Sequence, residues 1–264
     1  MFDALYIGAT GMQAQQLNVD TIANNLANVN TTGFKRARVS FTDLVARDST
    51  RLTAGSAGDE SGVFGHGLSL GAGVGIANLS KLFDMGDLKK TDAPFDVTVR
   101  GDGFMEVVLP DGSSAFTRGG TLKVNKDGLL ATLSGLALKP GISIPEDAQE
   151  LLVNADGRVQ VRTSVGGTPL DVGRMELVRF ASPQGLIAQG DNLYRSGAAS
   201  GDPISARAGE DGVGTLAQGY LEGSNVKMVE EMVNLMVAQR TYEANVKIVQ
   251  AADEILGLVN GLRR

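Results

Sequence analysis

The two ends of this chain share a pattern that its middle lacks. Both ends carry apolar residues at a seven-residue spacing and contain no proline, whereas all seven prolines lie between Pro94 and Pro203. A sustained seven-residue apolar repeat is typical of helices that pack lengthwise against other helices. The pattern therefore predicts an α-helix at each end of the chain and a different kind of structure between them.

The two predicted helices each carry an apolar stripe that we expect to form an assembly interface. In the N-terminal helix the stripe consists of Leu5, Met12, Val19, Ile22 and Leu26. In the C-terminal helix it consists of Met228, Met232, Leu235, Tyr242, Val246, Val249 and Leu256. Eight of the twelve residues from Val226 to Val237 are apolar, which is too wide for one contact stripe. This part of the helix needs neighbours on more than one side.

The free energies of chain ordering and of side-chain burial favour packing against other copies of the chain. Ordering about sixty terminal residues costs roughly 1–2 kcal/mol each in backbone entropy, while a fully buried aliphatic side chain returns roughly 1.5–3 kcal/mol. Two helices packed only against each other would be marginal, so we expect the ends to gain order on assembly. The alternative is a pair of core helices in an ordinary globular domain.

Composition excludes several classes of protein. The chain has 264 residues, 42% of them hydrophobic, and lacks an apolar run long enough to span a membrane. A net charge of −6, with no basic cluster beyond residues 35–38, argues against nucleic acid as a partner. The absence of cysteine excludes disulfides, thiolate metal ligands and cysteine nucleophiles. The N-terminal residues do not fit a cleaved secretory signal, because they carry no basic residue and are interrupted by Gly8 and Gly11.

Between the ends the character of the sequence changes twice. Residues 46–75 contain eight glycines and predict an extended or mobile arm with little regular structure. From Phe95 to about Ala188, short apolar runs alternate with turn signals such as residues 110–112, which predicts a mainly antiparallel β domain of roughly ten strands. The predicted class is therefore α+β. Its expected parts are a terminal helical assembly domain (1–32 and 224–264), an extended arm and linker (33–90), a β domain (91–200) and a return linker (201–223).

The sequence offers no arrangement that points to catalysis, a metal or a cofactor. Its only histidine, His66, has no acidic or thiol partner at ligand spacing. The glycines of residues 71–75 lack the spacing of a dinucleotide loop and a Gly-Lys-Ser/Thr ending. Asp102, Glu106 and Asp111 are better explained as strand-edge and turn residues than as paired catalytic carboxylates. We therefore predict no enzyme activity.

Two stretches near the ends resemble known protein signatures. Residues 24–36 resemble the N-terminal signature of flagellar axial proteins of the rod and hook, and residues 218–249 resemble their C-terminal signature. Weaker similarity covers residues 101–104, 110–112, 116–118, 183–186 and 192–194. In order and spacing these pieces are most similar to the distal-rod FlgG family, although Leu122 stands where that family has an aromatic residue. The signature positions are Asn24, Asn25, Asn28, Gly33, Phe34, Gln239, Arg240, Glu243 and Asn245.

The signature side chains allow two interpretations. The asparagines and Gly33 fit the end of a helix, because both residue types tolerate the left-handed conformation, and hydrogen bonding between subunits is the alternative. Gln239, Arg240, Glu243 and Asn245 would form a solvated face on an isolated helix. In a polymer they would be partly buried and would need partners.

The resemblance implies a structural subunit of the flagellar distal rod. Its expected form is a helical tube whose terminal helices surround an export channel, with the β domain outside and the arm bridging neighbours. Implied partners are further copies of the chain, proximal-rod and hook subunits, and basal-body ring proteins, with no nucleic acid and no membrane insertion. The rod would span the periplasm, and its subunits would be exported through the flagellum's own secretion apparatus without cleavage. The alternatives are a proximal-rod or hook-type axial protein, a surface-binding β-domain protein and, most distantly, a hydrolase.

Overall fold

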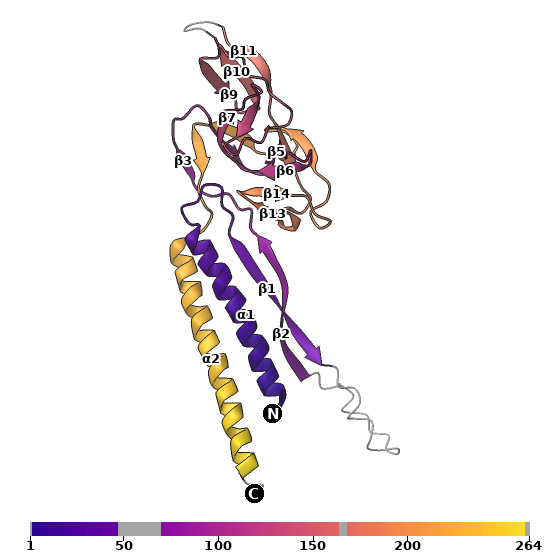
Figure 1. Cartoon of the computed structure of the whole chain (residues 1–264), viewed down its shortest axis with the longest axis vertical. Coiled ribbons are helices and arrows are strands. Elements are labelled where there is room, and N and C mark those ends of the chain that lie inside the picture. The colour runs from indigo at the N-terminus through magenta and orange to yellow at the C-terminus, as the bar shows by residue number, and fades with distance from the viewer. Residues whose placement is uncertain (1, 47–69, 164–167, 262–264) are drawn as a thin grey trace, which may run out of the picture. The chain divides into compact units, whose positions relative to one another are not determined.

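The computed structural model describes residues 2–46, 70–163 and 168–261, which form two compact units. The first unit contains both terminal helices and one pair of strands (Figure 1). The second contains residues 25–36 together with the described part of residues 81–228. The predicted α+β class, with a mostly antiparallel β domain between terminal helices, is confirmed.

The first unit is built from four elements. They are α1 (Phe2–Ala27), β1 (Ala37–Ala46), β2 (Leu70–Lys81) and α2 (Met228–Gly261). β1 and β2 pair with each other, and Figure 1 shows them running in opposite directions. The helices carry acidic residues in their first turns, Asp3 in α1 and Glu230 with Glu231 in α2, which complement the positive end of each helix dipole.

The two helices run antiparallel and approach each other closely near the chain termini. A Cβ atom added to Gly8 would lie 2.7 Å from Val249 Cγ2, and one added to Gly11 would lie 2.9 Å from Asn245 Nδ2. Since Gly8 precedes Gly11 while Val249 follows Asn245, the chain directions are opposite. The close approach of the two helices therefore explains why glycine, with no side chain, interrupts the apolar pattern of α1 at positions 8 and 11.

The second unit is built almost entirely from short strands. Within the described residues these are β3 (Leu88–Lys90), β4 (Asp96–Arg100), β5 (Phe104–Val108), β6 (Ser114–Thr117), β7 (Gly119–Val124), β8 (Leu130–Thr132), β9 (Glu150–Val153), β10 (Arg158–Arg162), β11 (Leu170–Arg174), β12 (Glu176–Arg179), β13 (Ile187–Gly190), β14 (Leu193–Arg195), β15 (Ile204–Arg207), β16 (Thr215–Gln218) and β17 (Tyr220–Glu222). One 3-10 turn, η1 (Pro183–Gly185), lies before β13.

The strands form small antiparallel sheets. The hydrogen-bonded orders are β13-β14-β6-β5-β12-β15, β16-β4-β7-β8, β11-β10-β9 and β17-β3. The turn signals of the sequence lie between consecutive strands, because residues 110–112 connect β5 with β6 and residues 155–157 connect β9 with β10. In the first of these turns Asp111 Oδ1 accepts a hydrogen bond from Ser113 N at 2.9 Å. Local turn chemistry thus sets these hairpins.

Two hydrophobic clusters hold the second unit together. The larger consists of aliphatic residues from β4, β5, β9, β10 and β12, with Val97, Val107 and Val159 fully buried. The smaller is aromatic and contains Phe83, Phe104, Phe116, Phe180 and Tyr194. Its rings meet edge to face, with centroids between 4.8 and 6.2 Å apart, a geometry that adds to the stabilisation from burial.

The structure differs from the sequence-based expectations in two stretches. Residues 201–223, expected to be a return linker, contain three strands, of which β16 pairs with β4 and β17 pairs with β3. Their partners lie more than a hundred residues earlier, so no local pattern reveals the pairing. Residues 70–75, expected to be irregular, belong to β2. The remaining arm residues 47–69, with His66, lie outside the described residues.

Candidate functional site

The start of α2 presents large apolar side chains to solvent. Val229 is 75% exposed, and Met228, Met232, Val233, Met236 and Val237 are between 46% and 59% exposed. Such side chains are normally buried when they gather on one helix. The exposed group coincides with the stretch that the sequence marked as too apolar for one contact stripe.

A second apolar face continues along the rest of α2. Val237, Ala244, Ala251 and Leu258 lie seven residues apart, and Ile248 and Ile255 lie between them on the same side of the helix. All six residues are exposed. We refer to Val233, Val237, Ala244, Ile248, Ala251, Ile255 and Leu258 as the outer apolar face.

The predicted assembly residues lie mainly on a different side of the helices. In α1, Ile22 is buried and Leu5, Met12, Val19 and Leu26 are half-buried. In α2, Leu235, Val246, Val249 and Leu256 are half-buried, whereas Met228, Met232 and Tyr242 are exposed. The stripe predicted from the sequence is therefore largely the half-buried side of the helices. The sequence prediction marked the exposed apolar side only as far as Val237 and did not follow it to Leu258. The seven-residue spacing from Val237 to Leu258 is the signal that could have revealed it.

The N-terminal signature surrounds the end of α1 and the loop that follows. Asn25 is buried, Asn24 is exposed, and Asn28 Oδ1 accepts a hydrogen bond from Thr31 Oγ1 at 3.1 Å. Gly33 does not end α1, because that helix ends at Ala27. Gly33 instead lies, with a φ of 71°, in the turn where Phe34 N donates to the Thr31 carbonyl at 3.3 Å. Its backbone nitrogen donates to the carbonyl of Glu222 at 2.7 Å, which joins the N-terminal signature to the C-terminal one.

Other signature residues occupy different environments. Phe34 is buried, and the Lys81 ammonium lies 4.2 Å from the centroid of its ring. In α2, Gln239, Arg240 and Glu243 are exposed. Asn245 is half-buried and faces Gly11 of α1.

A buried ion cluster lies where the two signatures meet in the second unit. Glu222 Oε1 is 2.7 Å from Lys35 Nζ, and Glu222 Oε2 is 3.2 Å from Arg118 Nε. The three side chains are 2%, 0% and 3% exposed, in the order Glu222, Lys35 and Arg118. Each cation makes a further hydrogen bond, because Lys35 Nζ also donates to the Asp84 carbonyl at 2.6 Å and Arg118 Nη1 donates to the Gly103 carbonyl at 3.0 Å. We call Lys35, Arg118 and Glu222 the clasp.

Burial shifts the titration of two groups at the clasp. It lowers the pKa of Lys35, and the adjacent Glu222 carboxylate opposes this shift without cancelling it. Burial also raises the pKa of Tyr194 to about 12, with the Glu222 charge acting in the same direction. Both shifts follow from the burial of these side chains.

Asn225 continues the network one turn before α2. Its Oδ1 accepts from Arg36 N at 2.8 Å, and its Nδ2 donates to the carbonyls of Leu82 and Asp84 at 2.8 and 3.1 Å. Its side chain fastens two linker segments to the segment that leads into α2.

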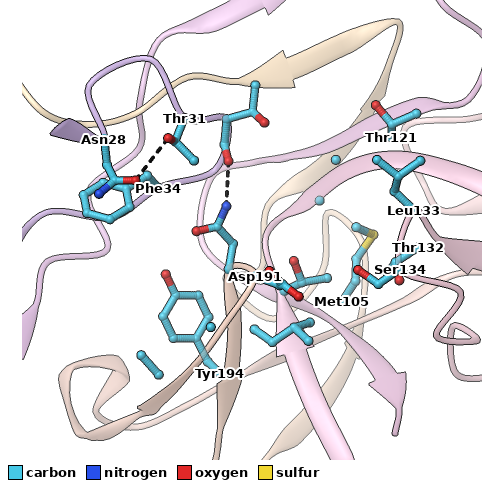
Figure 2. A pocket seen from close by; sticks show the side chains of 18 of the residues that line it. Asn28, Thr31, Phe34, Met105, Thr121, Thr132, Leu133, Ser134, Asp191 and Tyr194 are labelled. Carbon is cyan, nitrogen blue, oxygen red and sulfur yellow. Dashed lines mark hydrogen bonds between the residues drawn. The ribbon is translucent and has the colours of Figure 1, made fainter. Parts of the chain in front are cut away.

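A cavity of about 560 Å³ opens beside the N-terminal signature loop within the second unit. Figure 2 shows Asn28, Thr31 and Phe34 on one side of it and Thr132, Leu133 and Ser134 on the other. Its lining is mainly neutral, with Lys81 and Asp191 as the charged residues. Among the described residues no three histidine, cysteine or carboxylate side chains gather in a way that could hold a metal ion.

The terminal helices, the inserted β unit and the two signatures joined at the clasp agree with the arrangement that the resemblance to flagellar axial proteins implies. In the described part of the chain neither helix combines the length and hydropathy needed to cross a membrane. Comparison with protein-family models gives matches along the chain. The model described as "Flagella basal body rod protein" matches residues 5–35, "Flagellar hook protein FlgE/F/G D1 domain" matches residues 98–161, and "Flagellar basal body rod FlgEFG protein C-terminal" matches residues 217–262.

Full-length relatives narrow the class to one family. The flagellar basal-body rod protein FlgG of Borreliella burgdorferi is 42% identical over 266 residues, covering 100% of both chains. FlgG of Caulobacter vibrioides is 40% identical over 98% of this chain and 99% of the relative, and FlgG of Bacillus subtilis is 36% identical over 100% of both. This chain belongs to the FlgG family of flagellar basal-body rod proteins, and it is a structural subunit of the distal rod.

Proposed function

We propose that the chain polymerises into a helical tube in which the outer apolar face of α2 packs against helices of neighbouring copies. The supporting observation is the exposure of this face together with that of Met228, Val229, Met232 and Met236. Each large apolar side chain that becomes buried contributes up to roughly 1.5–3 kcal/mol. A row of such side chains along 34 helical residues supplies the association energy that a polymer needs at every subunit.

The half-buried stripe has a second role in this proposal. Leu235, Val249 and Leu256 are partly covered within the first unit and would lose their remaining exposure in the tube. The polar signature residues Gln239, Arg240 and Glu243 are exposed in the single chain. Once neighbouring helices cover them, they would need hydrogen-bond partners from those helices, because a buried polar group without a partner is costly.

The proposed work of the polymer is mechanical. The tube would act as a drive shaft between motor and hook and would enclose an export channel. It would carry no catalytic activity and would require no cofactor. It would span the periplasm, where it would contact proximal-rod and hook subunits at its ends and basal-body ring proteins around it.

Site-specific cross-linking in isolated basal bodies tests the polymer contact directly. Because the chain has no cysteine, Val237→Cys introduces a single attachment point for a photoactivated cross-linker. We expect it to join copies of the chain to one another. Leu170→Cys, at an exposed apolar position of the second unit, serves as the matched control for labelling efficiency. Labelled Val237→Cys rods that give no cross-link between copies would remove the outer apolar face from the proposal.

The position of the chain along the axial structure can be tested separately from its polymer contact. Immunogold labelling of isolated basal bodies distinguishes the distal rod from the proximal rod and the hook. Label confined to the distal rod supports the proposal, and label on the proximal rod or hook contradicts it.

A further inference from the structure

Three segments join the second unit to the rest of the chain. Residues 25–36 run from the end of α1 to β1, the segment that begins at Lys81 continues from the end of β2, and residues 220–228 run from β17 to the first residue of α2. These segments are distant in sequence, and hydrogen bonds join them to one another at the clasp. They are the covalent connections between the β sheets and the terminal helices.

The Glu222 carboxylate, in the third segment, accepts hydrogen bonds from the other two segments and from the β unit. From the third segment, its Oε1 accepts from Lys35 Nζ of the first segment at 2.7 Å and from Gly86 N of the second at 2.9 Å. Its Oε2 accepts from Arg118 Nε, which follows β6 in the β unit, at 3.2 Å. One side chain thus connects three segments and one sheet.

Further hydrogen bonds connect the same segments. Lys81 Nζ donates to the Lys35 carbonyl at 2.9 Å, and Gly223 N donates to the Asp87 carbonyl at 2.7 Å. The backbone of Gly86 passes so close to the Gly223 carbonyl that a Cβ atom there would overlap it. The second and third segments are therefore packed backbone against backbone at Gly86 and Gly223.

The burial of the clasp side chains determines how strongly the network resists separation of the segments. An exposed pair such as Arg162 and Glu150 can separate and exchange its partner for water at little cost. At the clasp, displacing one segment would leave a charge unpaired inside the protein, which is strongly unfavourable. The three segments are therefore expected to move as one body with the β unit.

We propose that the clasp is the force-transmitting joint of the subunit, with Glu222 as the positioning residue that fixes the segments leading to α1, β2 and α2. This inference rests on the proposed role of the polymer as a drive shaft. Load applied to the β unit reaches the helices through the charge network as well as through the peptide backbone. Bending of the chain is confined to the residues outside the clasp.

Lys35→Met tests the joint while leaving the fold intact. Methionine keeps much of the lysine stem, and the neutral pair of Glu222 and Arg118 remains buried, so no unpaired cation is created. We expect amides of residues 33–36 and 81–87 to exchange hydrogen at least about tenfold faster, because these segments open more often. Isolated rods carrying the variant should have a shorter persistence length in electron micrographs. The number of rods per cell should be unchanged.

Lys139→Met is the matched control. Lys139 pairs with Glu106 at 2.9 Å, but its side chain is 57% exposed, so this substitution should leave exchange and rod flexibility unchanged. Adding Glu222→Gln to Lys35→Met should increase flexibility little beyond the larger single effect, because both changes break the same joint. Lys35→Met rods with the stiffness and exchange rates of the unmodified protein would overturn the inference. The drive-shaft proposal would fail separately, if the unmodified chain formed no rods.

Discussion

Val237→Asp should abolish polymerisation and leave the single chain folded. Val237 lies in the interior of α2 and its side chain is 59% exposed. Valine and aspartate have similar helix propensities, and surface substitutions usually change stability by no more than about 0.5 kcal/mol. The helix content and thermal midpoint of the dilute variant should therefore match those of the unmodified chain.

The expected effect on assembly is much larger. Since more than half of the Val237 side chain is exposed, about 1–2 kcal/mol of its transfer free energy remains available in a contact between copies. An aspartate in the same contact forfeits that gain and adds a desolvation cost of at least about 2 kcal/mol. The sum is about 3–4 kcal/mol per contact. At 1.4 kcal/mol per factor of ten, the critical concentration for polymerisation rises at least about 100-fold.

Sedimentation at increasing protein concentration measures this critical concentration. Leu170→Asp makes the same chemical change at a position of the second unit that is 55% exposed, and it should polymerise close to the normal concentration. If Val237→Asp polymerises at the concentration of the unmodified chain while remaining fully helical, the outer apolar face does not carry the contact, and the argument from exposure fails.

Three further outcomes are expected. Leu235→Asp should be secreted but not incorporated into rods, with loss of motility, whereas Asp127→Asn at an outward turn should be tolerated; motile Leu235→Asp cells would argue against the half-buried stripe. Amides of residues 5–28 and 226–255 should gain protection from hydrogen exchange on assembly, and full protection in the dilute chain would contradict this. Because the pKa of Tyr194 is raised from 10.0 to about 12, a stabilising contribution of about 3 kcal/mol is present below pH 10 and is lost as pH rises through 12. Tyr194→Phe should lack this alkaline loss in urea unfolding, and equal pH profiles for the two proteins would refute the shift.

The sequence by itself determined the parts of the molecule that depend on local patterns. Seven-residue spacings predicted both terminal helices, since a helix repeats its faces over that interval. Turn signals at residues 110–112 and 155–157 predicted hairpins, because the backbone there is set by the residues themselves. The terminal signatures identified the family, which the comparison with full-length relatives confirms.

Tertiary structure decided which apolar face of α2 is covered and which is free. The stripe through Leu235 and the face through Val237 have similar hydropathy, so only the packing of α1 against one of them distinguishes the two. It also decided the pairing of β16 with β4 and of β17 with β3. The clasp is the clearest case, because Lys35 and Glu222 are 187 positions apart and each alone looks like an ordinary surface charge. Their burial and pairing depend on contacts between distant segments, and no local pattern in a sequence encodes such contacts.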